Sequence, residues 1–197
     1  MVKFFDALFG RSKPVKANLD QLFGLPQAAL TLEVATTFRP TGIGSVCYRA
    51  AEGGAFATTQ SDIQQLLDMS APGPTTSTAP KVERKEDEYG FTWLVVNHDP
   101  SDSAGLVTDL HAVNTSLEGA GFGPALLCSL LHFADDQGRK LALVYLYKRG
   151  SFYPFAPQAG ERRDNALELQ IRGLIANDLR VEDDLSRWFP VWGAPGL

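Results

Sequence analysis

The sequence predicts an α+β fold, with a mainly antiparallel sheet of hairpins flanked by helices. Strand-like segments occur in pairs separated by short turns, and helix-like segments follow these pairs rather than alternating singly with strands. The composition, 44% hydrophobic and 21% charged over 197 residues, is sufficient for a sizeable core. We expect residues 1–197 to form a single α+β domain.

The first half of the chain predicts one hairpin between helices. Asn18 is the expected N-cap of a short helix. Residues 30–38 alternate apolar and polar side chains as a half-buried strand does, and residues 44–50 read as the second strand after the turn-like RPTGIG. A helix is expected near 58–69.

A change of composition follows at residues 70–87. Prolines stand among serines and threonines there, and a run of charged residues comes next. This composition predicts a flexible linker that separates two lobes, residues 1–69 and 88–197.

The second half predicts three strong strands and two helices. Residues 89–97 are rich in aromatic and β-branched side chains, and the segment 101–118 repeats leucine and valine at helical spacing. Residues 125–135 and 140–150 form a second hairpin around the turn DDQG, and 151–157 read as an edge strand because it contains a proline. A helix over 162–177 and a last helical turn in 184–189 complete the prediction.

The sequence contains no recognisable catalytic, cofactor or metal motif. None of its three histidines has ligand spacing with another, and the two cysteines, Cys47 and Cys128, lie far apart in apolar strand-like runs. There is no nucleophile elbow and no phosphate-binding loop. We therefore expect a non-enzymatic protein with reduced thiols and no cofactor. The rival prediction is an unrecognised enzyme or small-ligand binder with a pocket near His111, His132, Arg162 and Arg163.

The net charge and the N-terminal residues indicate which partners and which cellular location to expect. The net charge of -5 and the pI of about 5.2 argue against nucleic acid as a partner. The N-terminus lacks the pattern of a signal peptide, so a cytoplasmic protein is expected. Its apolar residues would share one face of a basic helix, which either packs on the body or lies peripherally on a membrane; they are Phe4, Phe5, Leu8 and Phe9.

Two aromatic segments are the candidate protein-binding residues. Phe152, Tyr153 and Phe155 lie among basic residues on the expected edge strand, where they either pack on the body or present an edge to a protein partner. The C-terminal RWFPVWGAPGL adds Trp188 and Trp192, an unusual amount of apolar area for a chain end. We expect Trp188 and Phe189 to pack on the sheet, and Trp192 with the following residues to face a partner.

Long stretches of the sequence resemble the PspA-associated protein family PspAB. They are FDALFGRSKP, FRPTGIGSVCYRAAEG, YGFTWLVV, LVTDLHAVNTSLEGAGFGP, LALVYLYKRGSFYPFAP, GERRDNALELQIR and DLSRWFPVWGAPGL, with the main departure at 70–87. The resemblance implies a cytoplasmic accessory factor of the phage-shock envelope-stress response. It implies a protein partner, either a PspA-like coiled coil or an HtpX-type membrane protease, no catalytic residues, and a secretion-chaperone-like fold.

Overall fold

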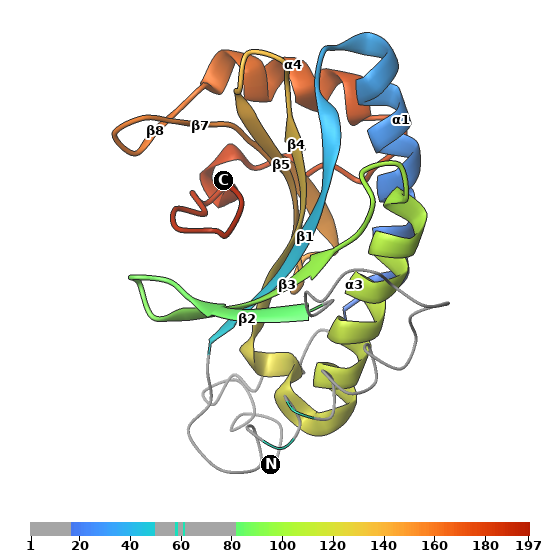
Figure 1. Ribbon diagram of the computed structural model, residues 1–197, viewed down its shortest axis with the longest axis vertical. Helices are drawn as coiled ribbons and strands as arrows, with labels where there is room; N and C mark the ends of the chain where they lie inside the picture. Colours follow the sequence, from blue (N-terminus) through green and yellow to red (C-terminus); the bar gives the residue numbers. More distant parts are fainter. Residues whose placement is uncertain (1–16, 50–57, 59–60, 62–81) are drawn as a thin grey trace, which may run out of the picture.

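The protein is built around an open antiparallel sheet. The computed structural model describes residues 17–49, 58, 61 and 82–197, and in this part of the chain six strands pair in the order β2-β3-β1-β4-β5-β6 (Figure 1). The strands are β1 (Arg39–Arg49), β2 (Val82–Glu86), β3 (Phe91–Asn97), β4 (Leu126–Ala134), β5 (Lys140–Leu146) and β6 (Ser151–Phe155). The α+β class expected from the sequence is confirmed.

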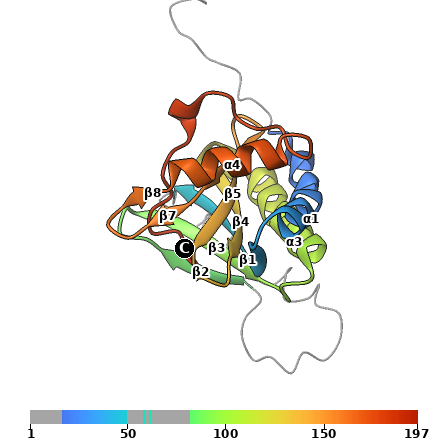
Figure 2. The same cartoon turned by 90° about the horizontal axis from the view of Figure 1, so that it is seen from above.

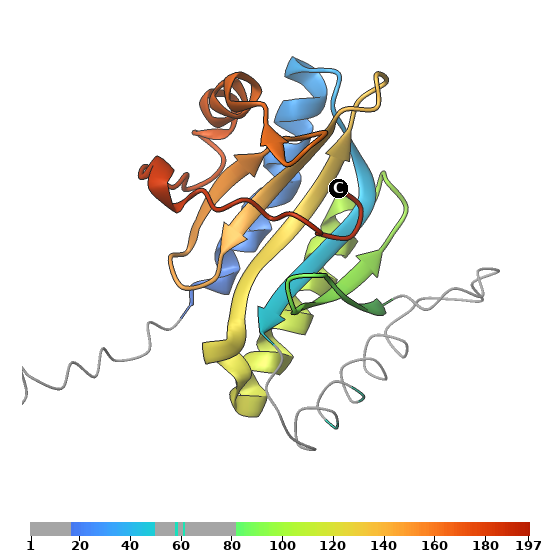
Figure 3. The ribbon, with the colours of Figure 1, turned by 90° about the vertical axis from the view of Figure 1, so that its left-hand side faces the viewer.

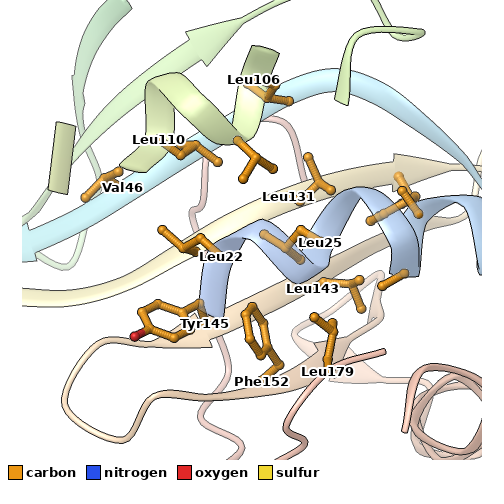
Figure 4. Packing of buried hydrophobic residues seen from close by; sticks show 14 of the residues in the cluster. Leu22, Leu25, Val46, Leu106, Leu110, Leu131, Leu143, Tyr145, Phe152 and Leu179 are labelled. Carbon is orange, nitrogen blue, oxygen red and sulfur yellow. The ribbon is translucent and has the colours of Figure 1, made fainter. Parts of the chain in front are cut away.

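Helices cover one face of this sheet. They are α1 (Leu25–Ala35) and α3 (Ser103–Leu117), with α4 (Asn165–Ile175) lying over the β6 end (Figures 1 and 2). Leucines from the helices meet the inward side chains of the strands in the main core (Figure 4). Leu22, Leu25, Leu106 and Leu110 are all fully buried there. Burial of this apolar face is the main stabilising contribution to the fold.

The C-terminal segment covers the opposite face. A second apolar cluster on this face joins strand residues such as Trp93, Cys128 and Tyr153 to Trp188 and Ala194. The last residues cross the sheet as an irregular chain, visible in red in Figure 3. Because both faces are covered, the central strands are apolar on both sides; β4, for example, is buried at nearly every position.

Residues 180–182 anchor this segment along the outer edge of β6. Phe152 N–H donates to Arg180 O at 2.8 Å, and Glu182 N–H donates to Phe152 O at 2.8 Å. Phe152 and Val181 form a parallel bridge. The free edge that a terminal strand would present is therefore partly paired within the chain itself.

The predicted elements of the second half are confirmed. β3, α3, the β4–β5 hairpin, the edge strand β6, α4 and a final 3-10 turn (Leu185–Arg187) lie within the predicted ranges, although β5 ends at Leu146 and residues 162–163 form a strand instead of the start of the helix. Short 3-10 and π turns (Leu19–Gly24, Glu118–Phe122, Gly123–Ala125) and the two-residue strands β7 (Pro157–Gln158) and β8 (Arg162–Arg163) complete the element list.

The hairpin predicted over 30–50 is wrong. Residues 30–35 belong to α1, whose buried side chains Leu25, Ala28, Ala29 and Leu32 follow helical spacing. The apparent strand alternation arose from Leu30 and Val34, which are 54% and 82% exposed and contribute nothing to the core. β1 therefore has no hairpin partner before it and pairs with β3 and β4 instead.

The end of the expected linker also differs from the prediction. Val82–Glu86 forms β2, which pairs with β3 through the register Val82↔Val96 to Glu86↔Thr92. Backbone pairing with a strong neighbouring strand fixes this charged segment, although its side chains favour solvent. Residues 70–81, the expected helix over 58–69 apart from Thr58 and Ser61, and the N-terminal Phe4, Phe5, Leu8 and Phe9 lie outside the described residues. No helix in the described part is long and apolar enough to cross a bilayer.

Candidate functional site

An apolar pocket lies between the second sheet face and the C-terminal segment. Its volume is about 500 Å³, within the range typical of small-molecule sites. Strand residues form its floor, the β2–β3 turn forms one wall, and residues 187–192 form the opposite wall. The pocket lies toward the end of the sheet at which β3 and β4 begin and β1 and β5 end.

The floor is made of uncharged side chains. Cys47 of β1 and Cys128 of β4 are directly opposite each other in the antiparallel register, and Trp93 of β3 lies on the other side of Cys47. A hydrogen bond with Cys128, together with burial, raises the pKa of Cys47 far above its usual range. Burial likewise raises the pKa of Tyr153. The thiol and the phenol therefore stay neutral, which keeps the floor apolar.

Asp87 organises the wall from the β2–β3 turn. Its carboxylate accepts hydrogen bonds from Tyr89 N–H and Phe91 N–H, each at 2.9 Å, and from the indole N–H of Trp93 at 2.8 Å. These three bonds fix the turn and orient Trp93 toward the pocket. The charge of Asp87 is thereby engaged by donors of its own wall.

The C-terminal wall is attached through aromatic contacts and hydrogen bonds. Trp188 stacks on Tyr153 with ring centroids 5.9 Å apart, and Trp192 meets Phe155 edge-on at 4.9 Å. The Tyr153 hydroxyl donates to Phe189 O at 2.7 Å, and the indole N–H of Trp188 donates to Glu182 O at 3.0 Å. The hydroxyl of Tyr153 and the indole N–H of Trp188 thus each have a hydrogen-bond partner, as polar groups of buried aromatic side chains require.

An ion pair between Arg163 and Glu168 also holds the C-terminal wall in place. Arg163 donates to the Glu168 carboxylate at 2.9 Å, donates to Trp188 O, and lies over the ring of Phe155 at 5.1 Å. Glu168 also accepts from Ala156 N–H at 2.9 Å. Burial raises the pKa of Glu168 above its usual value, although Arg163 opposes that shift. The pair links α4 and β6 to the C-terminal segment.

Three cations stand at the mouth of the pocket. Arg149 is paired with Glu182 at 3.2 Å and Arg187 with Asp184 at 2.9 Å. Lys148 is exposed and has no ion-pair partner within the described residues. Among the cations of the mouth, Lys148 is therefore the one that no carboxylate of the described residues pairs with.

The structure places the sequence-predicted aromatic residues mostly inside the molecule. Phe152 lies in the main core on the helix side, whereas Tyr153, Phe155 and Trp188 are buried on the pocket side. Trp192 is half-buried and lines the pocket. Phe189, which we expected to pack on the sheet, is 60% exposed because its backbone, rather than its ring, is held by Tyr153. That Trp192 and its neighbours contact a partner stays a prediction.

The four residues of the rival pocket are not brought together around this cavity. His111 lies on α3 near Asp20 at 3.4 Å, on the helix side of the sheet. His132 is fully buried on β4, where burial lowers its pKa to about 3. Arg162 is exposed on β8, and Arg163 supports the C-terminal wall. In the described part of the chain, no group of three or more His, Cys, Asp or Glu side chains is arranged to hold a metal ion.

Sequence reasoning missed the pocket floor. The sequence places Cys47 and Cys128 in separate apolar runs, and nothing in it pairs β1 with β4 across about 80 residues of chain. A usable signal was present in the apolar character of both sides of β3, β4 and β5. Strands that are apolar on both faces require a cover on each, and the aromatic C-terminus was the available second cover.

These features define an α+β protein whose sheet is covered by helices on one face and encloses an apolar pocket on the other. A family model described as PspAB, PspA associated protein B, matches residues 2–196. The chain therefore belongs to this family, as its sequence resemblance indicated. No curated protein and no solved structure matches the chain significantly, so the likeness to secretion chaperones stays a prediction.

Proposed function

We propose that this protein is a non-enzymatic accessory factor that binds PspA in the phage-shock response to membrane stress. The observation that carries the proposal is the family match over residues 2–196, since the family is described by its association with PspA. We also propose that the protein is cytoplasmic and that it lies at the membrane surface when its partner is bound to the membrane. An HtpX-type membrane protease is the second partner to test.

The surface around the pocket mouth is the proposed contact region. Tyr89 and Phe189, from opposite walls, are 46% and 60% exposed, and Trp192 is half-buried between them and the floor. Exposed aromatic side chains held on a rigid frame are typical of residues that dominate protein interfaces. Here the frame is rigid because Asp87 fixes one wall and Tyr153 the other.

The chemistry of the pocket supports a binding role over catalysis. A nucleophilic cysteine requires a lowered pKa, whereas hydrogen bonding with Cys128 and burial raise the pKa of Cys47. Both carboxylate oxygens of Asp87 accept hydrogen bonds from its own turn or from Trp93. These groups hold structure, and none of them is poised for proton transfer.

The direct test measures binding of purified PspA to the full chain and to two variants. Phe189→Ala removes an exposed aromatic ring at the pocket mouth, and Leu169→Ala removes an apolar side chain of similar exposure, 49%, on the distant face of α4. We expect Phe189→Ala to weaken the affinity by more than about fivefold, corresponding to the ~1 kcal/mol typical of contributing interface residues. Leu169→Ala should have no effect.

A Trp192→Ala variant and an HtpX-type protease extend the test. Loss of PspA binding with Trp192→Ala, at unchanged thermal stability, would support the tail as part of the contact. If wild-type protein binds neither PspA nor the protease at micromolar concentration, the accessory-factor proposal is wrong. Vesicle co-sedimentation of the full chain and of a chain lacking residues 1–13 tests the proposed membrane contact of Phe4, Phe5, Leu8 and Phe9.

A further inference from the structure

We propose that the pocket is a binding site for a free single-chain amphiphile, with an apolar chain inside and an anionic head group at Lys148. This inference concerns the interior of the pocket and is independent of PspA binding. The carrying observations are the pocket's volume, its apolar floor, and the position at its mouth of a cation, Lys148, that has no ion-pair partner among the described residues.

The interior suits an extended apolar chain. A volume of about 500 Å³ holds a ligand of moderate size, and the lining combines aromatic rings with aliphatic side chains and two thiols. Leu127, Leu146 and Val191 contribute aliphatic surface to a lining that also holds Trp93 and Trp192. Transfer of an alkyl chain from water into such a site contributes about 0.8 kcal/mol per methylene by burial of apolar surface.

The charged residues at the mouth determine which sign of head-group charge is favoured. Of the cations there, Arg149 and Arg187 are already paired with Glu182 and Asp184. The acidic residue of the lining, Asp87, keeps its negative charge, because its three donors are neutral N–H groups, but these bonds hold its carboxylate in the wall. Lys148 is therefore the group left to meet a ligand charge, and its ammonium favours an anion such as a carboxylate.

The interior also excludes a charged head group from the floor. The thiol of Cys47 is held protonated by Cys128 and by burial, and Tyr153 donates its proton to Phe189 O. The cations of the described lining are Lys148, Arg149 and Arg187 at the mouth, so none of them compensates an anion buried on the floor. The ligand therefore enters with its apolar end toward the cysteines.

The experiment titrates the full-length protein with dodecanoate below its micelle concentration. Binding is followed by intrinsic fluorescence, because two of the three tryptophans of the chain, Trp93 and Trp192, line the pocket. Dodecyltrimethylammonium, with the same chain and the opposite charge, is the matched ligand control. We expect saturable one-to-one binding of dodecanoate and clearly weaker binding of the cationic amphiphile.

Alkylation of the cysteines locates the bound chain. Cys47 and Cys128 are the only cysteines of the sequence, and both line the pocket. Because the thiolate is the reactive form and both thiols are buried, their slow reaction with iodoacetamide is first measured in the ligand-free protein at alkaline pH over hours, and saturating dodecanoate should lower that rate in proportion to occupancy. Binding without protection of the thiols would place the ligand elsewhere and overturn the proposal, as would the absence of saturable binding.

Charge reversal tests the head-group contact. Lys148→Glu should weaken dodecanoate binding by roughly threefold to tenfold, because one attractive exposed charge becomes repulsive. Arg84→Glu makes the same change on β2, outside the pocket, and should leave the affinity unchanged. Equal effects of the two variants would show that only net charge matters and would refute the assignment of Lys148. Binding to anionic vesicles with no binding of dodecanoate would refute the free amphiphile as the ligand.

Discussion

Replacing Trp188 should reveal that the C-terminal segment is an integral part of the fold. This side chain is 5% exposed, stacks on Tyr153 and donates its indole N–H to Glu182 O. Truncation of such a residue to alanine costs about 3–5 kcal/mol, through lost apolar contact and the cavity that remains. Since domains are stable by only about 5–15 kcal/mol, we expect Trp188→Ala to lose a large fraction of the unfolding free energy.

The neighbouring residue supplies a matched control for this experiment. Phe189 is 60% exposed, so Phe189→Ala should change the unfolding free energy by less than about 0.5 kcal/mol. Trp188→Phe keeps a ring over Tyr153 but leaves Glu182 O without its donor, which should cost about 1–3 kcal/mol. The three variants therefore form a graded series at two adjacent positions.

The assay is urea unfolding followed by circular dichroism, with the slope of the transition compared among variants. A loss below about 1 kcal/mol for Trp188→Ala, at an unchanged slope, would show that the segment contributes little to the folded state. Equal losses for Trp188→Ala and Phe189→Ala would refute the buried-versus-exposed distinction between these residues. Either result would also remove the structural basis of the pocket, whose outer wall this segment forms.

Three further predictions concern single polar groups. Asp164→Ala removes the carboxylate that caps α4 by accepting from Leu167 N–H at 3.0 Å, and should cost about 1 kcal/mol in thermal or urea unfolding. Burial alone would raise the pKa of Glu182, but hydrogen bonds from Ser151 and Arg149 outweigh it and lower the pKa below 4.5. The ionised Glu182 carboxylate therefore stabilises the fold at neutral pH. This contribution begins to fall below a pH of about 4.5 and is lost once the pH passes the lower pKa of the folded state. The difference in unfolding free energy between wild type and Glu182→Gln should therefore shrink over this range. Burial lowers the pKa of His132 to about 3, so its ring NMR signals should stay those of neutral imidazole down to that pH, and a transition near 6.5 would contradict its burial.

The predictable part of the fold was the part in which local pattern and tertiary role agree. α3 repeats its buried side chains at 3–4 residue spacing, and β4 and β5 are separated by a tight turn. In α1 the two signals disagreed, since exposed Leu30 and Val34 imitated a strand alternation. The sequence does not distinguish exposed apolar residues from buried ones, so both contribute to an apparent periodicity.

The sequence by itself determined the α+β class, the β4–β5 hairpin, the absence of recognisable catalytic motifs, and the family. These follow from short-range periodicity and from long matching stretches of sequence. The tertiary structure alone decided that β1 inserts between β3 and β4, that Cys47 meets Cys128, and that the aromatic C-terminus covers the second sheet face. The reason is physical: strand order and the docking of a chain end depend on which distant apolar surfaces exclude water together, and that information is not contained in any local window of the sequence.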